Sequence, residues 1–209
     1  MTRLFATLAT GTAVVFLGAS VALSAGWLGN LFGGADDGFT ACRKGAVAGE
    51  IGGPFELVDA QGRTVTDADV ITEPSLVYFG YTFCPDVCPM DTARNADAVD
   101  LLAERGYSAT PVFISIDPKR DTPQVVGDFA ANLHDKMIGL TGTAEQVKAA
   151  SQAYRTYYRA QDGDAEYYLV DHSTFTYLVL PGHGFVDFFR REDSAEAMAD
   201  RTACFIDAT

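Results

Sequence analysis

The chain has 209 residues, of which 48% are hydrophobic and 21% are charged, a balance typical of a globular protein with one ordinary core. Its 28 acidic and 15 basic residues give a net charge of −13, which argues against binding to nucleic acid or to an anionic membrane surface, since both require a basic face. Only four cysteines and three histidines are available for a metal or redox site.

The first 35 residues differ from the rest of the chain. No ionisable side chain occurs between Arg3 and Asp36, and residues 4–32 are mostly apolar. A membrane-spanning helix needs about 20 apolar residues, whereas the apolar part of a cleaved signal peptide has about 7–15. We therefore expect residues 1–35 to be a single-pass membrane anchor, with a signal sequence cleaved near Ala22–Ala25 as the alternative.

Either form of this segment gives the same topology. Because Arg3 keeps the N-terminus inside, everything after Asp36 is exported. We expect a protein of the bacterial inner membrane whose soluble domain lies in the periplasm. Glycine-rich sequence follows the apolar stretch, and we assign residues 36–48 to a linker and residues 49–209 to one domain.

The domain begins with a predicted β-hairpin at Phe55–Thr66, with its turn at Gln61-Gly62. Apolar, β-rich runs predict two strands buried on both faces of a sheet, at Ser75–Phe83 and Thr110–Asp117. The aromatic residues of the first strand are expected to alternate between the two faces as part of the core.

Helices alternate with these strands. They are predicted at Met90–Gly106, from Pro123 with Thr122 as the N-cap, at Thr143–Ala160, and at residues 194–206. A second hairpin is predicted at Ser173–Arg190. This order predicts an α/β domain with a thioredoxin-like mixed sheet, βαβ crossovers, helices on both faces and an antiparallel edge.

Two cysteines follow the first core strand in the stretch YFGYTFCPDVCPMD. The loop that holds Cys84 and Cys88 lies at the carboxyl end of that strand, where open α/β sheets place their active sites. Pro89 suits the first helical position, so we expect Cys88 to be the N-cap, where the helix dipole favours a thiolate.

The spacing of this pair leaves several functions open. A structural disulfide would close a very short ring and stabilise the fold little. The C-x-x-x-C spacing is wider than the C-x-x-C of thioredoxin-like redox sites, which leaves room for an ion between the sulfurs. Two thiolates and one imidazole suit copper, whereas structural zinc normally takes a fourth protein ligand.

A third ligand is expected from the histidines. His172 directly precedes the closing hairpin, and a thioredoxin-like sheet brings that position beside the end of the first core strand, across from Cys84 and Cys88. His134 and His183 fall at a predicted helix end and a predicted turn, where we expect solvated imidazoles.

The segments FGYTFCPDVCP, ISIDPKRDTP and DHSTFTYLV, in this order, resemble the Sco/SenC family of copper-binding proteins over about residues 48–200. This resemblance implies a thioredoxin-like fold and a site for Cu(I) or Cu(II) on Cys84, Cys88 and His172. It also implies a metallochaperone role in assembling the binuclear copper centre of cytochrome c oxidase subunit II, with another periplasmic copper chaperone as a candidate donor.

Two other functions remain open. In the first, the protein is a thiol–disulfide oxidoreductase that reduces the oxidase cysteines, and Cys84 or Cys88 attacks the disulfide. In the second, it is a membrane-tethered redox or copper sensor. A chaperone would not be an enzyme, whereas a reductase would be. The substitution His172→Ala should separate the two functions: loss of both copper affinity and oxidase assembly would indicate delivery, and retained assembly would indicate reduction.

Some residues outside the Cys-Cys-His set also carry expectations. Cys42 and Cys204 are expected to form a disulfide, because an exported protein seldom leaves two cysteines idle. Asp117 is expected to end a strand and Asp121 to help cap the next helix, with the alternative that both lie near the copper loop and attract a cationic partner. Asp86 is expected either to tune the metal or to be solvated.

Overall fold

The structure is a computed structural model that describes residues 38–45, 50–164 and 167–209. The expected anchor or signal sequence, residues 1–35, lies outside the described residues. Residues Ala41–Thr209 form one compact unit. Within the described ranges, none of the helices combines the length and the apolar character that a membrane crossing requires.

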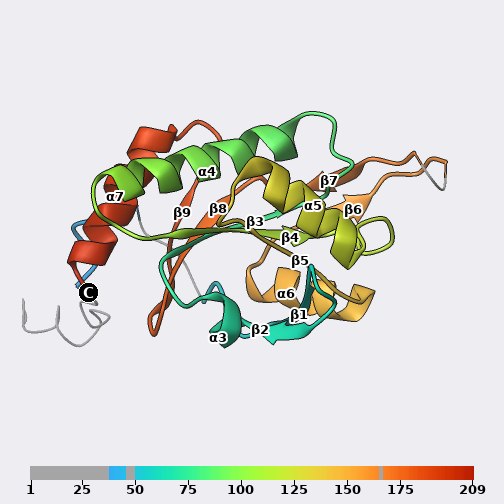
Figure 1. Ribbon diagram of the computed structural model, residues 1–209, viewed down its shortest axis with the longest axis horizontal. Helices are drawn as coiled ribbons and strands as arrows, with labels where there is room; N and C mark the ends of the chain where they lie inside the picture. The colour runs from blue at the N-terminus through green and yellow to red at the C-terminus, as the bar shows by residue number, and fades with distance from the viewer. Residues whose placement is uncertain (1–37, 46–49, 165–166) are drawn as a thin grey trace, which may run out of the picture. The chain divides into compact units, whose positions relative to one another are not determined.

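A seven-stranded sheet with the order β2-β1-β5-β4-β3-β8-β9 runs through this unit (Figure 1). Its strands are β1 (Glu56–Asp59), β2 (Thr64–Thr66), β3 (Ser75–Gly80), β4 (Thr110–Ser115), β5 (Ile138–Thr141), β8 (Thr176–Leu180) and β9 (Gly184–Phe189). The three central strands β5, β4 and β3 are parallel, and β1 and β8 flank them antiparallel. The predicted mixed sheet, both hairpins and the thioredoxin-like order of elements are therefore confirmed.

Helices cover both faces of the sheet (Figure 1). They are α3 (Asp67–Val70), α4 (Val87–Glu104), α5 (Pro123–Leu133), α6 (Ala144–Ala153) and α7 (Ala195–Asp207). The side chains of Thr122, Thr143 and Ser194 each accept a hydrogen bond from a backbone N–H in the first turn of α5, α6 and α7, so the predicted start of α5 at Thr122 is confirmed. Helices α4, α5 and α7 lie on one face, and α6 lies on the other.

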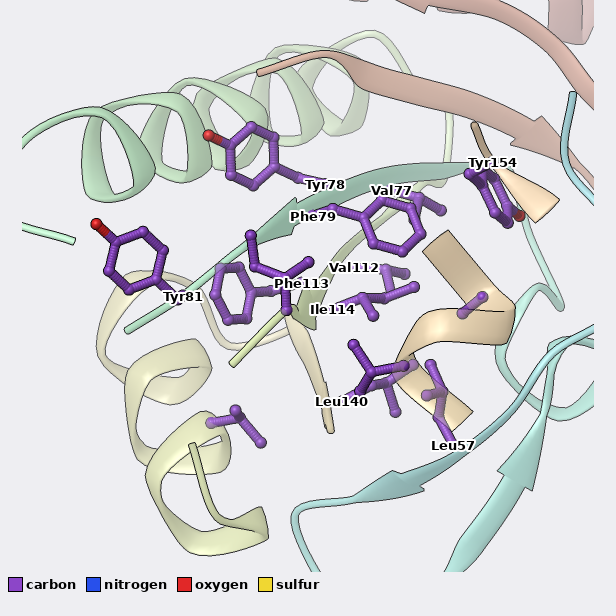
Figure 2. Close-up of a cluster of buried hydrophobic side chains, with 14 of the residues drawn as sticks. Leu57, Val77, Tyr78, Phe79, Tyr81, Val112, Phe113, Ile114, Leu140 and Tyr154 are labelled. Carbon is purple, nitrogen blue, oxygen red and sulfur yellow. The ribbon is translucent and has the colours of Figure 1, made fainter. Parts of the chain in front are cut away.

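The core follows the alternation of side chains along β3 (Figure 2). Tyr78 points toward α4, and its neighbour Phe79 points to the opposite face. There the Phe79 ring lies 5.3 Å from Tyr154 and 5.9 Å from Tyr177, centroid to centroid. All three rings are buried, and each such side chain contributes about 1.5–3 kcal/mol by leaving water. This aromatic packing fixes β3, the strand that leads to the cysteines.

The structure differs from the sequence prediction after α6. The helix expected at Thr143–Ala160 ends at Ala153, and Tyr158–Ala160 forms a strand, β6, that pairs with β7 (Val170–His172). Tyr154 is almost fully buried and Arg155 has a left-handed φ of 52°, which a continuing helix cannot contain. Burial of Tyr154 on Phe79 thus outweighs the helical pattern of the sequence.

Cys42 and Cys204 form the expected disulfide, and their Cα atoms lie 5.7 Å apart. The bond joins the segment before the sheet to α7, across a sequence separation of 162 residues. It leaves Cys84 and Cys88 as the two free cysteines.

Candidate metal centre

The cysteine loop joins the end of β3 to the start of α4. Both thiols are buried, with 8% of Cys84 and none of Cys88 exposed. The backbone N–H of Cys88 donates to the sulfur of Cys84 at 3.3 Å, and the N–H of Cys84 donates to the carbonyl of Tyr81 at the same distance. The loop is therefore folded back on itself, so that the two sulfurs lie on the same side.

Gly80, the last residue of β3, makes room for this arrangement. A Cβ atom at this position would lie 3.0 Å from the sulfur of Cys88 and 2.8 Å from the Tyr78 ring. Such distances are below ordinary van der Waals contact. A glycine at the end of the strand thus allows Cys88 to pack directly against the sheet.

One local expectation for Cys88 is wrong. The N-cap of α4 is Asp86, and Cys88 is the second residue of the helix. The helix can begin before Pro89 because a proline in the first turn removes an N–H that has no intrahelical partner. The Asp86 side chain is exposed and makes no capping hydrogen bond, so it is solvated.

The expectation that Cys88 favours a thiolate is also wrong, because the structure favours the thiolate at Cys84 instead. Burial raises the pKa of the Cys88 thiol well above its usual range. Burial opposes ionisation of Cys84 too, but hydrogen bonds from the backbone of Asp86 and Cys88 outweigh it and lower the pKa of Cys84. Without metal, Cys84 is therefore the more readily ionised sulfur of the pair.

His172 ends β7 and reaches the cysteine loop from the other side of the site. Its Nε2 atom lies 3.3 Å from the sulfur of Cys88. Its Nδ1 atom lies 2.7 Å from the carbonyl oxygen of Ser173, which can only accept, so Nδ1 carries the proton and Nε2 offers a lone pair. Burial lowers the pKa of His172, so the imidazole is neutral at neutral pH.

The structure brings the three predicted ligands together. One sulfur from each of Cys84 and Cys88 and one ring nitrogen of His172 lie within 4.8 Å of one another, and in the part of the chain that the structure describes this is the one such group of three or more. His134 instead pairs with Asp100 at 3.1 Å, and His183 is exposed. Two soft sulfurs and a neutral imidazole fit copper in either oxidation state.

A buried polar network around Asp91, three residues after Cys88, is one feature that the sequence did not predict. The Tyr78 hydroxyl donates to the carboxylate of Asp91 at 3.1 Å, and both side chains are buried. Arg191 and Arg94 lie 3.3 and 3.6 Å from the same carboxylate. The position of Asp91 three residues after Cys88, on one helix face, is the signal that could have indicated it.

The two aspartates of the 117–121 turn take different places. Asp117 does not end a strand as expected, because β4 ends two residues earlier, at Ser115. Asp121 does not cap α5, because Thr122 does so. Asp121 instead accepts hydrogen bonds from the N–H of Thr82 at 3.0 Å and from the hydroxyl of Ser115 at 2.6 Å. It is 1% exposed and so supports the cysteine loop from within, where it cannot attract a partner.

Phe83, expected in the core, is 55% exposed. The strand β3 ends at Gly80, so the alternation of faces does not continue to this residue. Phe83 therefore lies on the surface beside Cys84, while Tyr81 is buried. This exposed ring belongs to the residue next to Cys84 in the chain.

Known proteins are similar to this chain in sequence and in fold. Protein SenC of Rhodobacter capsulatus is 54% identical over 202 residues, which cover 96% of this chain and 89% of SenC. A crystal structure of Arabidopsis thaliana ScoI with copper bound matches at a TM-score of 0.72 and 38% identity, over 75% of this chain and 99% of ScoI.

A third likeness is in fold alone. BsSco, described as a member of the Sco family of cytochrome c oxidase assembly proteins, matches at a TM-score of 0.59 and 23% identity, over 76% of this chain and 95% of BsSco. Finally, the model of one family, SCO1/SenC, matches residues 43–207, a range that includes all three ligands. With its Cys-Cys-His site and this match, the chain belongs to the SCO1/SenC family.

Proposed function

We propose that this protein is a copper metallochaperone that carries one copper ion on Cys84, Cys88 and His172. The observation that carries the proposal is the convergence of these three donor atoms, all within 4.8 Å of one another, from two separate parts of the chain. The copper-bound ScoI structure, from a relative 38% identical, supports copper as the ion.

The site suits delivery of the ion as well as its binding. Three protein ligands leave a copper ion open to a further donor, so an incoming thiolate or imidazole can attach before a site ligand leaves. Phe83, next to Cys84 in the chain, and Met90, two residues after Cys88, are 55% and 60% exposed. Exposed apolar side chains of this kind favour contact with a partner protein.

The proposed recipient is subunit II of cytochrome c oxidase, whose binuclear copper centre would take the ion, with another periplasmic copper chaperone as the donor. The description of BsSco as a cytochrome c oxidase assembly protein and the membership of this chain in the same family support the recipient. The net charge of −13 favours a partner with a basic rim.

A transfer experiment tests delivery. The copper-loaded protein is mixed with the reduced, copper-free soluble domain of subunit II, and copper on each protein is measured after separation. Cys84→Ser or Cys88→Ser should abolish tight binding, and His172→Ala should weaken binding and transfer. The matched control is His183→Ala, which changes an exposed histidine away from the site. Wild-type transfer by the His172→Ala variant would exclude this ligand set.

Thiol–disulfide exchange with the oxidase cysteines is the second candidate function. The lowered pKa of Cys84 favours it, as does the position of the two free thiol sulfurs within 4.8 Å of each other. In such a reaction the Cys84 thiolate attacks the substrate disulfide, and Cys88 then resolves the mixed disulfide, so that the substrate leaves with two thiols and the protein with one disulfide. Reduction of oxidised subunit II that persists in the His172→Ala variant would support this function.

The proposed location is the periplasmic side of a bacterial inner membrane, with residues 1–35 as the anchor. The charge pattern around Arg3 and the Cys42–Cys204 disulfide, which needs an oxidising compartment, support this location. Protease treatment of intact spheroplasts provides the test. Full protection of residues 38–209 before lysis would contradict the proposed topology.

A further inference from the structure

The strand that carries His172 does not belong to the main sheet. β7 pairs with β6 in a separate two-stranded ribbon, in which His172 lies opposite Tyr158. In Figure 1 this ribbon projects beyond the seven-stranded sheet. A two-stranded ribbon alone is marginally stable, so the position of the His172 ring depends on what fixes the ribbon to the domain.

Arg120 lies between this ribbon and the cysteine loop. Its guanidinium carbon is 3.7 Å from the ring centroid of Tyr168, on the segment that leads into β7. The same carbon is 4.9 Å from the Phe83 ring, beside Cys84. Cation–π contacts of this kind contribute about 0.5–2 kcal/mol each, more where water is excluded.

Hydrogen bonds close the arrangement. Arg120 donates from Nη1 to the carbonyl of Tyr168 at 2.9 Å and from Nε to the carboxylate of Asp117. The Tyr168 hydroxyl donates to the other oxygen of Asp117 at 2.6 Å. The side chains of Arg120 and Asp117 are 11% and 5% exposed, so these bonds are shielded from water. We call Arg120, Asp117 and Tyr168 the arginine clasp.

The turn that carries Arg120 is itself fixed to the cysteine loop. Asp121 accepts hydrogen bonds from both the N–H and the hydroxyl of Thr82. One side of the clasp is therefore attached to the residues just before Cys84, and the other side holds Tyr168, four residues before His172. The clasp thus links the two parts of the chain that supply the metal ligands.

We propose that Arg120 is a positioning residue for His172, and that it acts by holding the β6–β7 ribbon against the cysteine loop. Without the clasp the two sulfurs stay together, since their loop is folded by its own hydrogen bonds, but the imidazole no longer meets them. A lysine cannot replace Arg120. Its ammonium group is not planar, so it cannot stack on the Tyr168 ring and at the same time donate a hydrogen bond to the Tyr168 carbonyl. The proposal rests on the proposed copper function for its metal-binding readout only.

Cu(I) affinity, measured by competition with a chromogenic chelator, provides the first test. Arg120→Ala and Arg120→Lys should each weaken binding about tenfold, as losses of residues that orient a ligand usually do. In a His172→Ala background the same substitutions should change affinity less than about twofold, because the ligand they position is gone. The control is Arg159→Ala, on the same ribbon with a 71% exposed side chain.

A metal-free measurement separates this proposal from the proposed function. Diethyl pyrocarbonate modifies accessible imidazoles, and its rate at His172 is read by peptide mass spectrometry with His183 as the internal reference. Arg120→Ala should raise the rate at His172 at least about threefold over the reference, and Arg159→Ala should leave it unchanged. If the His172→Ala variant bound copper as tightly as the wild type, the proposed ligand set would be wrong. The modification rate would still test whether Arg120 positions His172, because it is measured without metal.

Two results would overturn the proposal. The first is an equal loss of copper affinity from Arg120→Ala with and without His172, which would place its action in the cysteine loop. The second is an unchanged modification rate at His172. If Arg120→Ala does not fold, Tyr168→Phe provides a milder variant, because it removes only the hydroxyl that donates to Asp117. Its loss of copper affinity should be smaller and should likewise depend on the presence of His172.

Discussion

Reduction of the Cys42–Cys204 disulfide is expected to destabilise the domain strongly. The bond closes a ring across a sequence separation of 162 residues. For a ring of this length, the entropy that the bond removes from the unfolded chain corresponds to about 5 kcal/mol at 25 °C. Residual structure in the unfolded chain subtracts from this figure, so we expect a measured loss of about 2–5 kcal/mol.

The assay is urea denaturation followed by far-ultraviolet circular dichroism, with and without a phosphine reductant. It uses the Cys84→Ser/Cys88→Ser variant, in which Cys42–Cys204 is the one disulfide that can form. For a chain of this size the reductant should also lower Tm by about 5–15 °C. The matched control carries serine at all four cysteine positions, and its denaturation curve should not respond to the reductant.

A loss below about 1 kcal/mol on reduction would refute the reasoning. It would mean that the segment around Cys42 detaches from α7 in the reduced folded protein and gains conformational entropy there, or that the unfolded chain is already compact. The slope of the denaturation curve distinguishes these two explanations, because a more compact unfolded chain exposes less surface and lowers the slope.

Three further predictions concern single residues. Gly80→Ala should weaken copper binding at least about tenfold with little change in secondary structure, because the added Cβ displaces the sulfur of Cys88; chelator competition measures this. Asp121→Ala should destabilise the fold by about 3 kcal/mol in urea denaturation, since buried donors lose their acceptor. Burial works against the Glu73 carboxylate, but hydrogen bonds led by Lys136 outweigh it and lower its pKa to about 2. Because this folded-state pKa lies below the unfolded value, Glu73 stabilises the fold above about pH 4.5, by roughly 1–2 kcal/mol after solvent screening, and loses this contribution as the pH falls toward 2. A Glu73→Gln variant should therefore be less stable than the wild type at pH 7 and equal to it near pH 2, and a constant difference across that range would contradict the assignment.

The sequence by itself determined the elements whose signals are local. The apolar run at β3, the turn at Gln61-Gly62 and the cap at Thr122 each depend on neighbouring residues, and each was placed correctly or within a few residues. The cysteine spacing and its position after a buried strand likewise identified the ligand pair. Backbone conformation and hydrogen bonding over a few residues carry this information.

Local signals failed where a distant contact has the larger free energy. The helix predicted at Thr143–Ala160 ends at Ala153, because Tyr154 packs on Phe79 of β3. Cys88 lies inside α4 instead of capping it, and its burial against Gly80 raises its pKa, so the more readily ionised sulfur is that of Cys84. Neither outcome can be read from neighbouring residues.

Only the tertiary structure assembled the metal site. Cys88 and His172 are separated by 84 residues in the chain. Their sulfur and Nε2 atoms lie 3.3 Å apart because the fold places the cysteine loop next to the β6–β7 ribbon. The Arg120 side chain reaches both of these segments through stacking and hydrogen bonds that have no sequence periodicity. Sequence patterns report which residues share one face of one element, whereas a ligand set drawn from two distant segments exists only once burial has fixed those segments against each other.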